Sequence, residues 1–108
     1  MLTKKLDGHY NVIFKGPNGW GTGAIAIRGN EIFGADPNGG TYDGKITKTS
    51  DGYHVDLNVV VTDGRNVITG QPGTIKLPLN LPRDFDGKDI TGPGGFSVTI
   101  RKIRDFII

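Results

Sequence analysis

Apolar and polar residues alternate along most of this chain, and the alternation predicts β-strands. The clearest run is residues 53–62. One face of that run carries Tyr53, Val55, Leu57, Val59 and Val61, and the other carries His54, Asp56, Asn58, Val60 and Thr62. Because successive side chains of a strand point to opposite faces, we expect one face to be buried and the other to be at least partly wet. A slip of one residue would exchange the two faces, so the pairing register is well specified.

Residues 19–36 predict the hairpin around which the other strands are arranged. Gly29-Asn30 separates its two strands and is a dipeptide that supplies the positive φ angles of a two-residue turn. Gly21 and Gly23 lie inside the first strand, where glycine loses backbone entropy and has no side chain to pack. We therefore expect a close approach or a sharp bend at these two positions, as in a strongly curled, barrel-like sheet.

Clusters of glycine, proline and asparagine separate further runs of the same alternation. The predicted strands are residues 9–15, 20–28, 32–33, 41–49, 53–62, 74–79, 88–91 and 96–103. Ile75, Leu77 and Leu79 are predicted to point inward. Pro78 cannot donate to a hydrogen-bond ladder, so its strand is expected at or near a sheet edge. Helical spacing is limited to a single possible turn at residues 82–85.

Short strands joined hairpin after hairpin predict one all-β domain over residues 1–108. The expected architecture is an antiparallel, up-and-down barrel of seven to eight strands, with a sandwich as the alternative. A chain of 108 residues builds one core. Its 18 glycines are about twice the usual share, which fits many tight turns.

Charge and cysteine content narrow the function classes. The 13 basic and 11 acidic residues give a net charge of +2, which is too weak to indicate a nucleic-acid partner. The lack of cysteine excludes a disulfide framework, a thiolate nucleophile and a Cys-based zinc site. The first eight residues lack the apolar core of a signal peptide, and no run approaches the ~20 apolar residues of a membrane span. We expect a soluble cytoplasmic protein without a membrane partner.

The residues that could carry chemistry do not form a catalytic or metal-binding set. His9 and His54 fall on polar strand faces without metal-ligand spacing, and Asp56 offers His54 only a surface pairing. The acidic residues of 84–89 lack the later bidentate Glu of a calcium loop. The basic residues of 101–104 fall on both strand faces, as expected of a solvated strand end. We therefore expect no catalytic residue, no metal and no cofactor, and hence no enzyme.

The inward positions of the predicted strands would line the barrel interior. These residues are Tyr10, Val12, Phe14, Gly21, Gly23, Ile25, Ile27, Tyr42, Ile46, Val55, Leu57, Val59, Phe96, Val98 and Ile100. An eight-stranded barrel is either filled by its side chains or holds one small ligand. Gly21, Gly23 and Gly44 are expected to leave room inside, which favours a cavity.

Apolar residues outside this inner set predict an interface. Val60, Ile103, Phe106, Ile107 and Ile108 form an apolar set on the outside, and such a patch commonly marks a protein contact. We expect a homodimer through these residues. Trp20 is expected to cap a barrel mouth or to pack on the outer face.

Four short motifs resemble, in their order, the GrlR-like negative regulators of type III secretion in bacteria. They are Asp7-Gly8-His9-Tyr10, Gly21-Thr22-Gly23, Gly34-Ala35-Asp36 and Tyr42-Asp43-Gly44, and they cover the first half of the chain. The resemblance implies a small, dimeric, lipocalin-like barrel whose apolar interior accepts a lipid-like molecule. It also implies that a transcriptional activator is bound through an acidic surface motif. Residues 47–51, Thr-Lys-Thr-Ser-Asp, stand at that position here and do not form an acidic motif.

Two functions follow from these expectations. The first is a non-enzymatic regulatory protein that binds a protein partner, such as a transcriptional regulator, through the barrel exterior. The alternative is a carrier or sensor of a small apolar, lipid-like ligand in the barrel interior.

Overall fold

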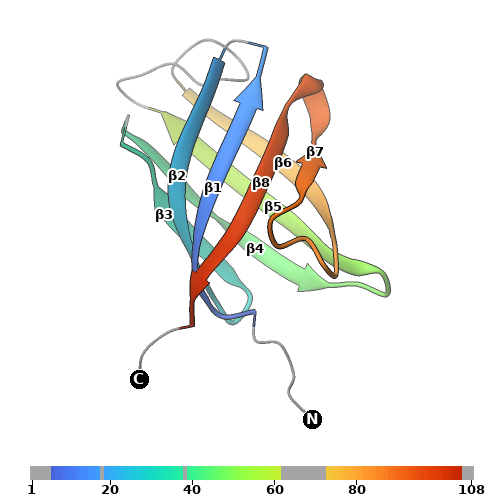
Figure 1. Ribbon diagram of the computed structural model, residues 1–108. Coiled ribbons are helices and arrows are strands. Elements are labelled where there is room, and N and C mark those ends of the chain that lie inside the picture. Colours follow the sequence, from blue (N-terminus) through green and yellow to red (C-terminus); the bar gives the residue numbers. More distant parts are fainter. Residues whose placement is uncertain (1–5, 18, 38, 62–72, 106–108) are drawn as a thin grey trace.

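The computed structural model describes residues 6–17, 19–37, 39–61 and 73–105, and it is an all-β barrel (Figure 1). Its elements are β1 (Gly8–Gly16), β2 (Gly19–Arg28), β3 (Glu31–Ala35), β4 (Gly40–Lys48), β5 (Gly52–Val61), β6 (Gly73–Pro82), β7 (Asp89–Thr91), the 3₁₀ turn η1 (Pro93–Gly95) and β8 (Ser97–Arg104). The sheet order is β6-β5-β4-β3-β2-β1-β8-β7, and the pairings are antiparallel. The predicted up-and-down barrel is confirmed, with eight strands.

The barrel is nearly closed, and its seam lies between β6 and β7. These two strands stand at opposite ends of the sheet order, so Pro78 lies on an edge strand as predicted. Residues 83–88 cross the seam from β6 and continue along β8. There the Gly87 N–H donates to the carbonyl of Ile100, and the Lys102 N–H donates to the Asp86 carboxylate, each at 2.8 Å.

The central hairpin has the predicted two-residue turn. Arg28 and Glu31 face each other across it. Gly29 has a φ of +62°, whereas no described residue other than glycine, Asn30 included, has a positive φ. Glycine at the first central position is the requirement of a type II′ turn, whose twist matches the strands that it joins.

The inward faces of the strands form one apolar core. The alternation of β5 is observed as predicted, since Val55, Val59 and Val61 are buried and Asp56 is exposed. The core residues are Tyr10, Val12, Ile25, Ile27, Ile32, Tyr42, Ile46, Val55, Val59, Val61, Leu77, Leu79, Leu81, Phe85, Ile90, Phe96, Val98 and Ile100.

Phe85 lies in the connection after β6, at the end of the barrel where β1 and β5 begin, and belongs to the core although it was not among the predicted interior residues. It is 4% exposed. Its ring stacks 6.2 Å from that of Tyr10 and meets that of Tyr53 edge-on at 5.8 Å. The Tyr10 hydroxyl donates to the carbonyl of Leu6 at 2.5 Å. These three rings, named here the aromatic plug, close the interior at this end.

Other atoms approach the strand glycines closely, as predicted for Gly21 and Gly23, but the room expected beside Gly23 and Gly44 is occupied, which corrects that part of the sequence interpretation. A Cβ atom on Gly21 would lie 2.9 Å from the ring of Phe14, and one on Gly23 would lie 2.9 Å from the ring of Tyr42. A Cβ atom on Gly44 would lie 2.1 Å from a backbone oxygen of β5. Aromatic rings fill the first two positions, and the tight coiling of β4 against β5 fills the third.

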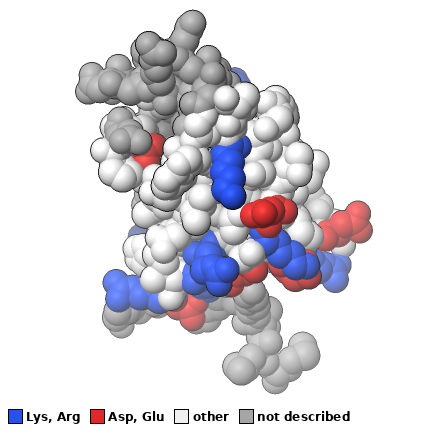
Figure 2. Space-filling view, turned by 45° about the horizontal axis from the view of Figure 1, so that its top comes forward, with Lys and Arg blue, Asp and Glu red and all other residues white. Residues whose placement is uncertain are grey.

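On the face shown in Figure 2, the charged side chains of the described residues do not form a patch of one sign. In the view of Figure 2 they lie mainly in the lower half, with basic and acidic groups side by side. The described surface above them in this view is mostly uncharged. This distribution agrees with the small net charge of +2.

Candidate functional site

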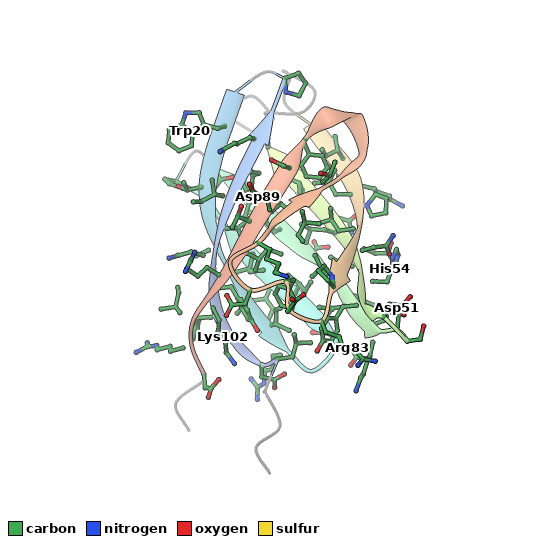
Figure 3. All side chains as sticks on the ribbon, turned by 45° about the vertical axis from the view of Figure 1, so that its right-hand side comes forward. Trp20, Asp51, His54, Arg83, Asp89 and Lys102 are labelled. Carbon is green, nitrogen blue, oxygen red and sulfur yellow. The ribbon has the colours of Figure 1, made fainter. Side chains whose placement is uncertain are left out.

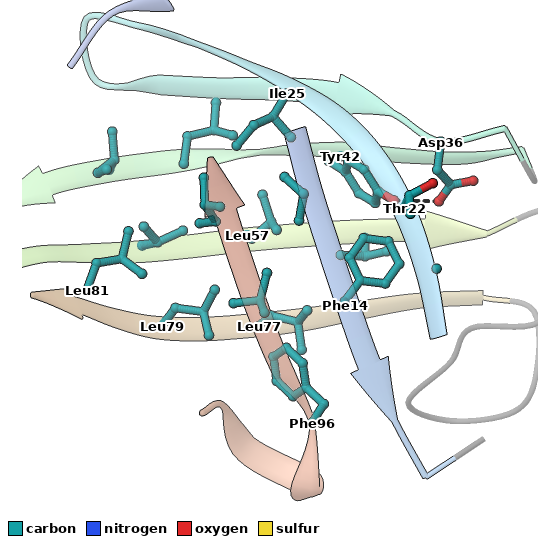
Figure 4. A pocket seen from close by; sticks show the side chains of 18 of the residues that line it. Phe14, Thr22, Ile25, Asp36, Tyr42, Leu57, Leu77, Leu79, Leu81 and Phe96 are labelled. Carbon is teal, nitrogen blue, oxygen red and sulfur yellow. Dashed lines mark hydrogen bonds between the residues drawn. The ribbon is translucent and has the colours of Figure 1, made fainter. Parts of the chain in front are cut away.

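An apolar cavity of about 80 Å³ lies inside the barrel (Figure 4). Strands β1 to β6 and β8 all contribute side chains to its wall. The lining residues are Val12, Phe14, Gly21, Thr22, Ile25, Ile27, Ile32, Asp36, Tyr42, Ile46, Val55, Leu57, Val59, Val61, Leu77, Leu79, Leu81, Phe96, Val98 and Ile100.

Most residues predicted for the interior are among those that line this cavity. Tyr10 and Gly23 are the exceptions, because Tyr10 belongs to the aromatic plug and Gly23 lies against the ring of Tyr42. The predicted set lacked Thr22, Ile32, Asp36, Val61, Leu77, Leu79 and Leu81. The alternation had already placed Val61, Leu77 and Leu79 on inward faces, and Leu81 continues it beyond Pro78. Whether these residues bind a ligand stays a prediction.

Asp36 and Tyr42 form the polar part of the cavity wall. The Tyr42 hydroxyl donates to Oδ2 of Asp36 at 2.5 Å, and the N–H of Gly40 donates to Oδ1 at 2.9 Å. Figure 4 shows this pair beside Phe14 at one end of the lining. Gly40 has no side chain there, and a Cβ atom on it would lie only 2.3 Å from Oδ2 of Asp36. The chain therefore folds so that this carboxylate is held in one position.

The electrostatics of Tyr42 fix its role in this pair. Burial raises the pKa of its hydroxyl, and the hydrogen bond to Asp36 and the charge of that carboxylate raise this pKa further. The hydroxyl therefore stays protonated and donates to Asp36. The ring is buried, and it meets the ring of Phe14 edge-on at 5.9 Å.

Tyr10 of the aromatic plug is also held in its neutral form. Burial is the largest reason that the pKa of Tyr10 is raised, followed by the negative charge of Asp86. The amino group of Lys102 lies 6.0 Å from the centre of the Tyr10 ring and pairs with Asp105. Lys102 is half-buried, so the basic end of β8 is only partly the solvated strand end expected from the sequence.

The outside of the barrel carries a second feature, an apolar face on β1, β2, β3 and β8. The large apolar side chains exposed among the described residues are Ile13, Trp20, Phe33 and Ile103, and they lie on these four strands. Between Phe33 and Ile103 runs an open groove of about 480 Å³, with Ala24 and Ala26 in its wall. We call these six residues the outer apolar face.

Of the residues predicted for a dimer interface, the structure describes Val60 and Ile103. Ile103 is 53% exposed and lines the groove, whereas Val60 is half-buried on β5, which does not pair with β8. Residues 106–108 lie outside the described part of the chain. Trp20 is 69% exposed and points away from the barrel (Figure 3). A homodimer through the predicted residues stays a prediction.

The remaining candidates form surface interactions. His54 points outward (Figure 3), with Nδ1 2.9 Å from Oδ1 of Asn80 and Nε2 3.2 Å from Oδ1 of Asp56. The hydrogen bond to Asn80 raises the pKa of His54, and the contact with Asp56 adds to this rise. His9 lies beside the outer groove.

The acidic residues of 84–89 each have a partner. Asp84 pairs with Lys88, Asp86 accepts from a backbone N–H, and Asp89 accepts from the hydroxyl of Thr99. Within the described ranges, no three or more His, Cys, Asp or Glu side chains are grouped as metal ligands would be.

Comparison with known proteins adds no family to this description. No model of a known protein family matches the sequence, and no curated protein matches it as a relative. The part of the chain that the structure describes contains no helix with the length and apolar character needed to cross a bilayer. The function is therefore inferred from the fold, the interior cavity and the outer apolar face.

Proposed function

We propose that this chain is a non-enzymatic regulatory protein that binds a protein partner through the outer apolar face. The observation that carries the proposal is the one-sided distribution of exposed apolar residues. They lie on β1, β2, β3 and β8, whereas the outward positions of β4 are Thr41, Asp43, Lys45 and Thr47. Exposed large apolar side chains gathered on one side of a molecule are typical of a protein interface.

The resemblance to GrlR-like regulators supports a partner such as a transcriptional regulator. In those proteins the contact is expected at an acidic motif, and the corresponding residues 47–51 here do not form one, because Asp51 is their single acidic residue and Lys48 is basic. The proposal therefore places the contact at Phe33, Ile103 and the small residues between them. Bulky apolar side chains beside a groove are the kind of anchor that dominates binding energy at interfaces.

The test compares two variants that add the same charge at different places. Phe33→Glu alters the outer apolar face, and Thr74→Glu alters an exposed position of β6. A partner captured from a lysate of the source organism is identified, purified and titrated against each folded variant. We expect Phe33→Glu to weaken binding by about 30-fold or more, as loss of a hot-spot residue does. Equal binding by both variants would show that the face is not the contact.

The cavity supports a second candidate function, the carriage or sensing of a small apolar ligand. Its wall is almost entirely apolar, and the aromatic plug closes one end of the barrel. A dry apolar cavity of about 150 Å³ can hold a benzene molecule. A volume of about 80 Å³ is roughly half of that, so it suits a short alkyl chain, and a ring or a longer chain requires movement of lining side chains such as Phe14.

Native mass spectrometry tests this second candidate. We expect gently purified protein to show an added mass that disappears when Val59→Phe fills the cavity. Circular dichroism establishes that the variant keeps its β structure. Repeated absence of any added mass in the unaltered protein would count against a resident ligand.

A further inference from the structure

The cavity contains one charged side chain among its described lining residues, and this sets the class of ligand it prefers. We propose that the cavity selects small molecules with an apolar body and a protonated amine, which Asp36 binds, over molecules with an acidic head. The inference rests on the second candidate function, ligand binding in the barrel interior. It concerns which head group is accepted.

The position of Asp36 is fixed before any ligand arrives. Gly40 and Tyr42 donate to its two oxygens at 2.9 and 2.5 Å, and the N–H of Asp36 donates to the carbonyl of Gly40 at 2.9 Å. A carboxylate oxygen accepts more than one hydrogen bond, so these contacts orient the group and leave it able to accept from an amine. A preoriented acceptor loses little entropy on binding.

The sign of the charge discriminates between head groups. The Tyr42 hydroxyl donates a hydrogen bond to Asp36, and no lysine, arginine or histidine is among the described residues that line the cavity. A carboxylate or phosphate head would face the charge of Asp36 in surroundings of low polarity, where like charges repel strongly. An ammonium head would form a charge-assisted hydrogen bond with it.

The apolar wall of the cavity determines which ligand body is preferred. Lining residues such as Ile25, Leu57 and Leu77 offer no hydrogen-bond partner to the body of a ligand. About 80 Å³ is roughly half of the ~150 Å³ that holds benzene, so a chain of five carbons requires movement of a lining side chain such as Phe14, and a ring requires more. The expected ligand is thus a small primary amine with an alkyl group.

Three probes with the same alkyl chain separate the contributions of body and head. They are n-pentylamine, n-pentanol and pentanoate, each titrated into the full chain by isothermal calorimetry at neutral pH. We expect the amine to bind about tenfold or more tightly than the alcohol, as a hydrogen bond to a charged group implies. Pentanoate is expected to bind more weakly than the alcohol.

Two variants locate the preference. Asp36→Asn keeps an acceptor but removes the charge, so it should abolish the advantage of the amine while leaving alcohol binding within about twofold. Asp43→Asn removes an exposed carboxylate on the outer face of β4 and should change neither. If Asp36→Asn does not fold, the ratio of amine to pentanoate binding by the unaltered protein still decides the question.

The possible results separate the role of Asp36 from ligand binding in the cavity. Binding of alcohol and amine with equal affinity, or an amine preference that survives Asp36→Asn, would overturn the role of Asp36 and leave the cavity as a binding site. Failure of all three probes to bind would overturn ligand binding in the cavity, and this inference with it.

Discussion

Replacing Phe85 with alanine tests whether a residue outside the strands holds the barrel together. The side chain is 4% exposed and contacts two rings, those of Tyr10 and Tyr53. Truncating a buried Phe to Ala costs about 3–5 kcal/mol. A domain of this size has a free energy of unfolding of about 5–15 kcal/mol. We therefore expect Phe85→Ala to remove a large part of the stability and to lower the Tm by on the order of 20 °C.

Urea unfolding followed by far-ultraviolet circular dichroism measures this loss. Phe85→Leu retains part of the volume and should cost much less, and Ile13→Ala, at a 42% exposed position, should cost little. Amide hydrogen exchange at Gly87 adds a local measurement, because its bond to Ile100 depends on how residues 83–88 are held. A loss below about 1 kcal/mol for Phe85→Ala would refute the view that the aromatic plug stabilises the barrel.

Three further predictions concern other parts of the barrel. Gly44→Ala should destabilise the fold by about 1–3 kcal/mol or more in denaturant unfolding, because its Cβ would lie 2.1 Å from the backbone of β5; a neutral effect would contradict the close approach. Tyr42→Phe should cost about 1–3 kcal/mol by the same measurement, since Asp36 loses a buried donor, and an unchanged stability would show that the bond contributes nothing. Asn80→Ala should lower the pKa of His54 in an NMR titration, because their hydrogen bond is the largest reason for its rise. Since that pKa is higher in the folded state, the associated stability is present below about pH 6.5 and is lost as the pH rises through the folded value; a pKa that does not move in the variant would contradict this link.

The strands were predictable because alternation is a local property of the sequence. In β5 the register of Val55, Val59 and Val61 follows directly from it. The edge position of β6 followed from the missing N–H of Pro78. Both inferences need only the chemistry of neighbouring residues, so no tertiary information was required.

Two of the residues that were missed lie where no period operates. Phe85 and Asp36 are in connections, and nothing local indicates that one enters the core and the other lines the cavity. The expectation that Gly23 and Gly44 leave room inside the barrel was wrong for a related reason. Whether the space beside Gly23 is empty depends on Tyr42, which is distant in sequence and comes near only when the sheet coils.

The pairing of β1 with β8 differs from most other strand pairings of the barrel in the loop-closure entropy that its formation costs. The contacts β1–β2, β2–β3, β3–β4, β4–β5 and β7–β8 join strands that are close in sequence, whereas β1–β8 places Val12 opposite Ile100. Bringing such distant segments together costs more loop-closure entropy than forming a hairpin. We expect refolding to begin with the hairpins and to end with the union of the first and last strands, so the interior becomes enclosed only in the final step.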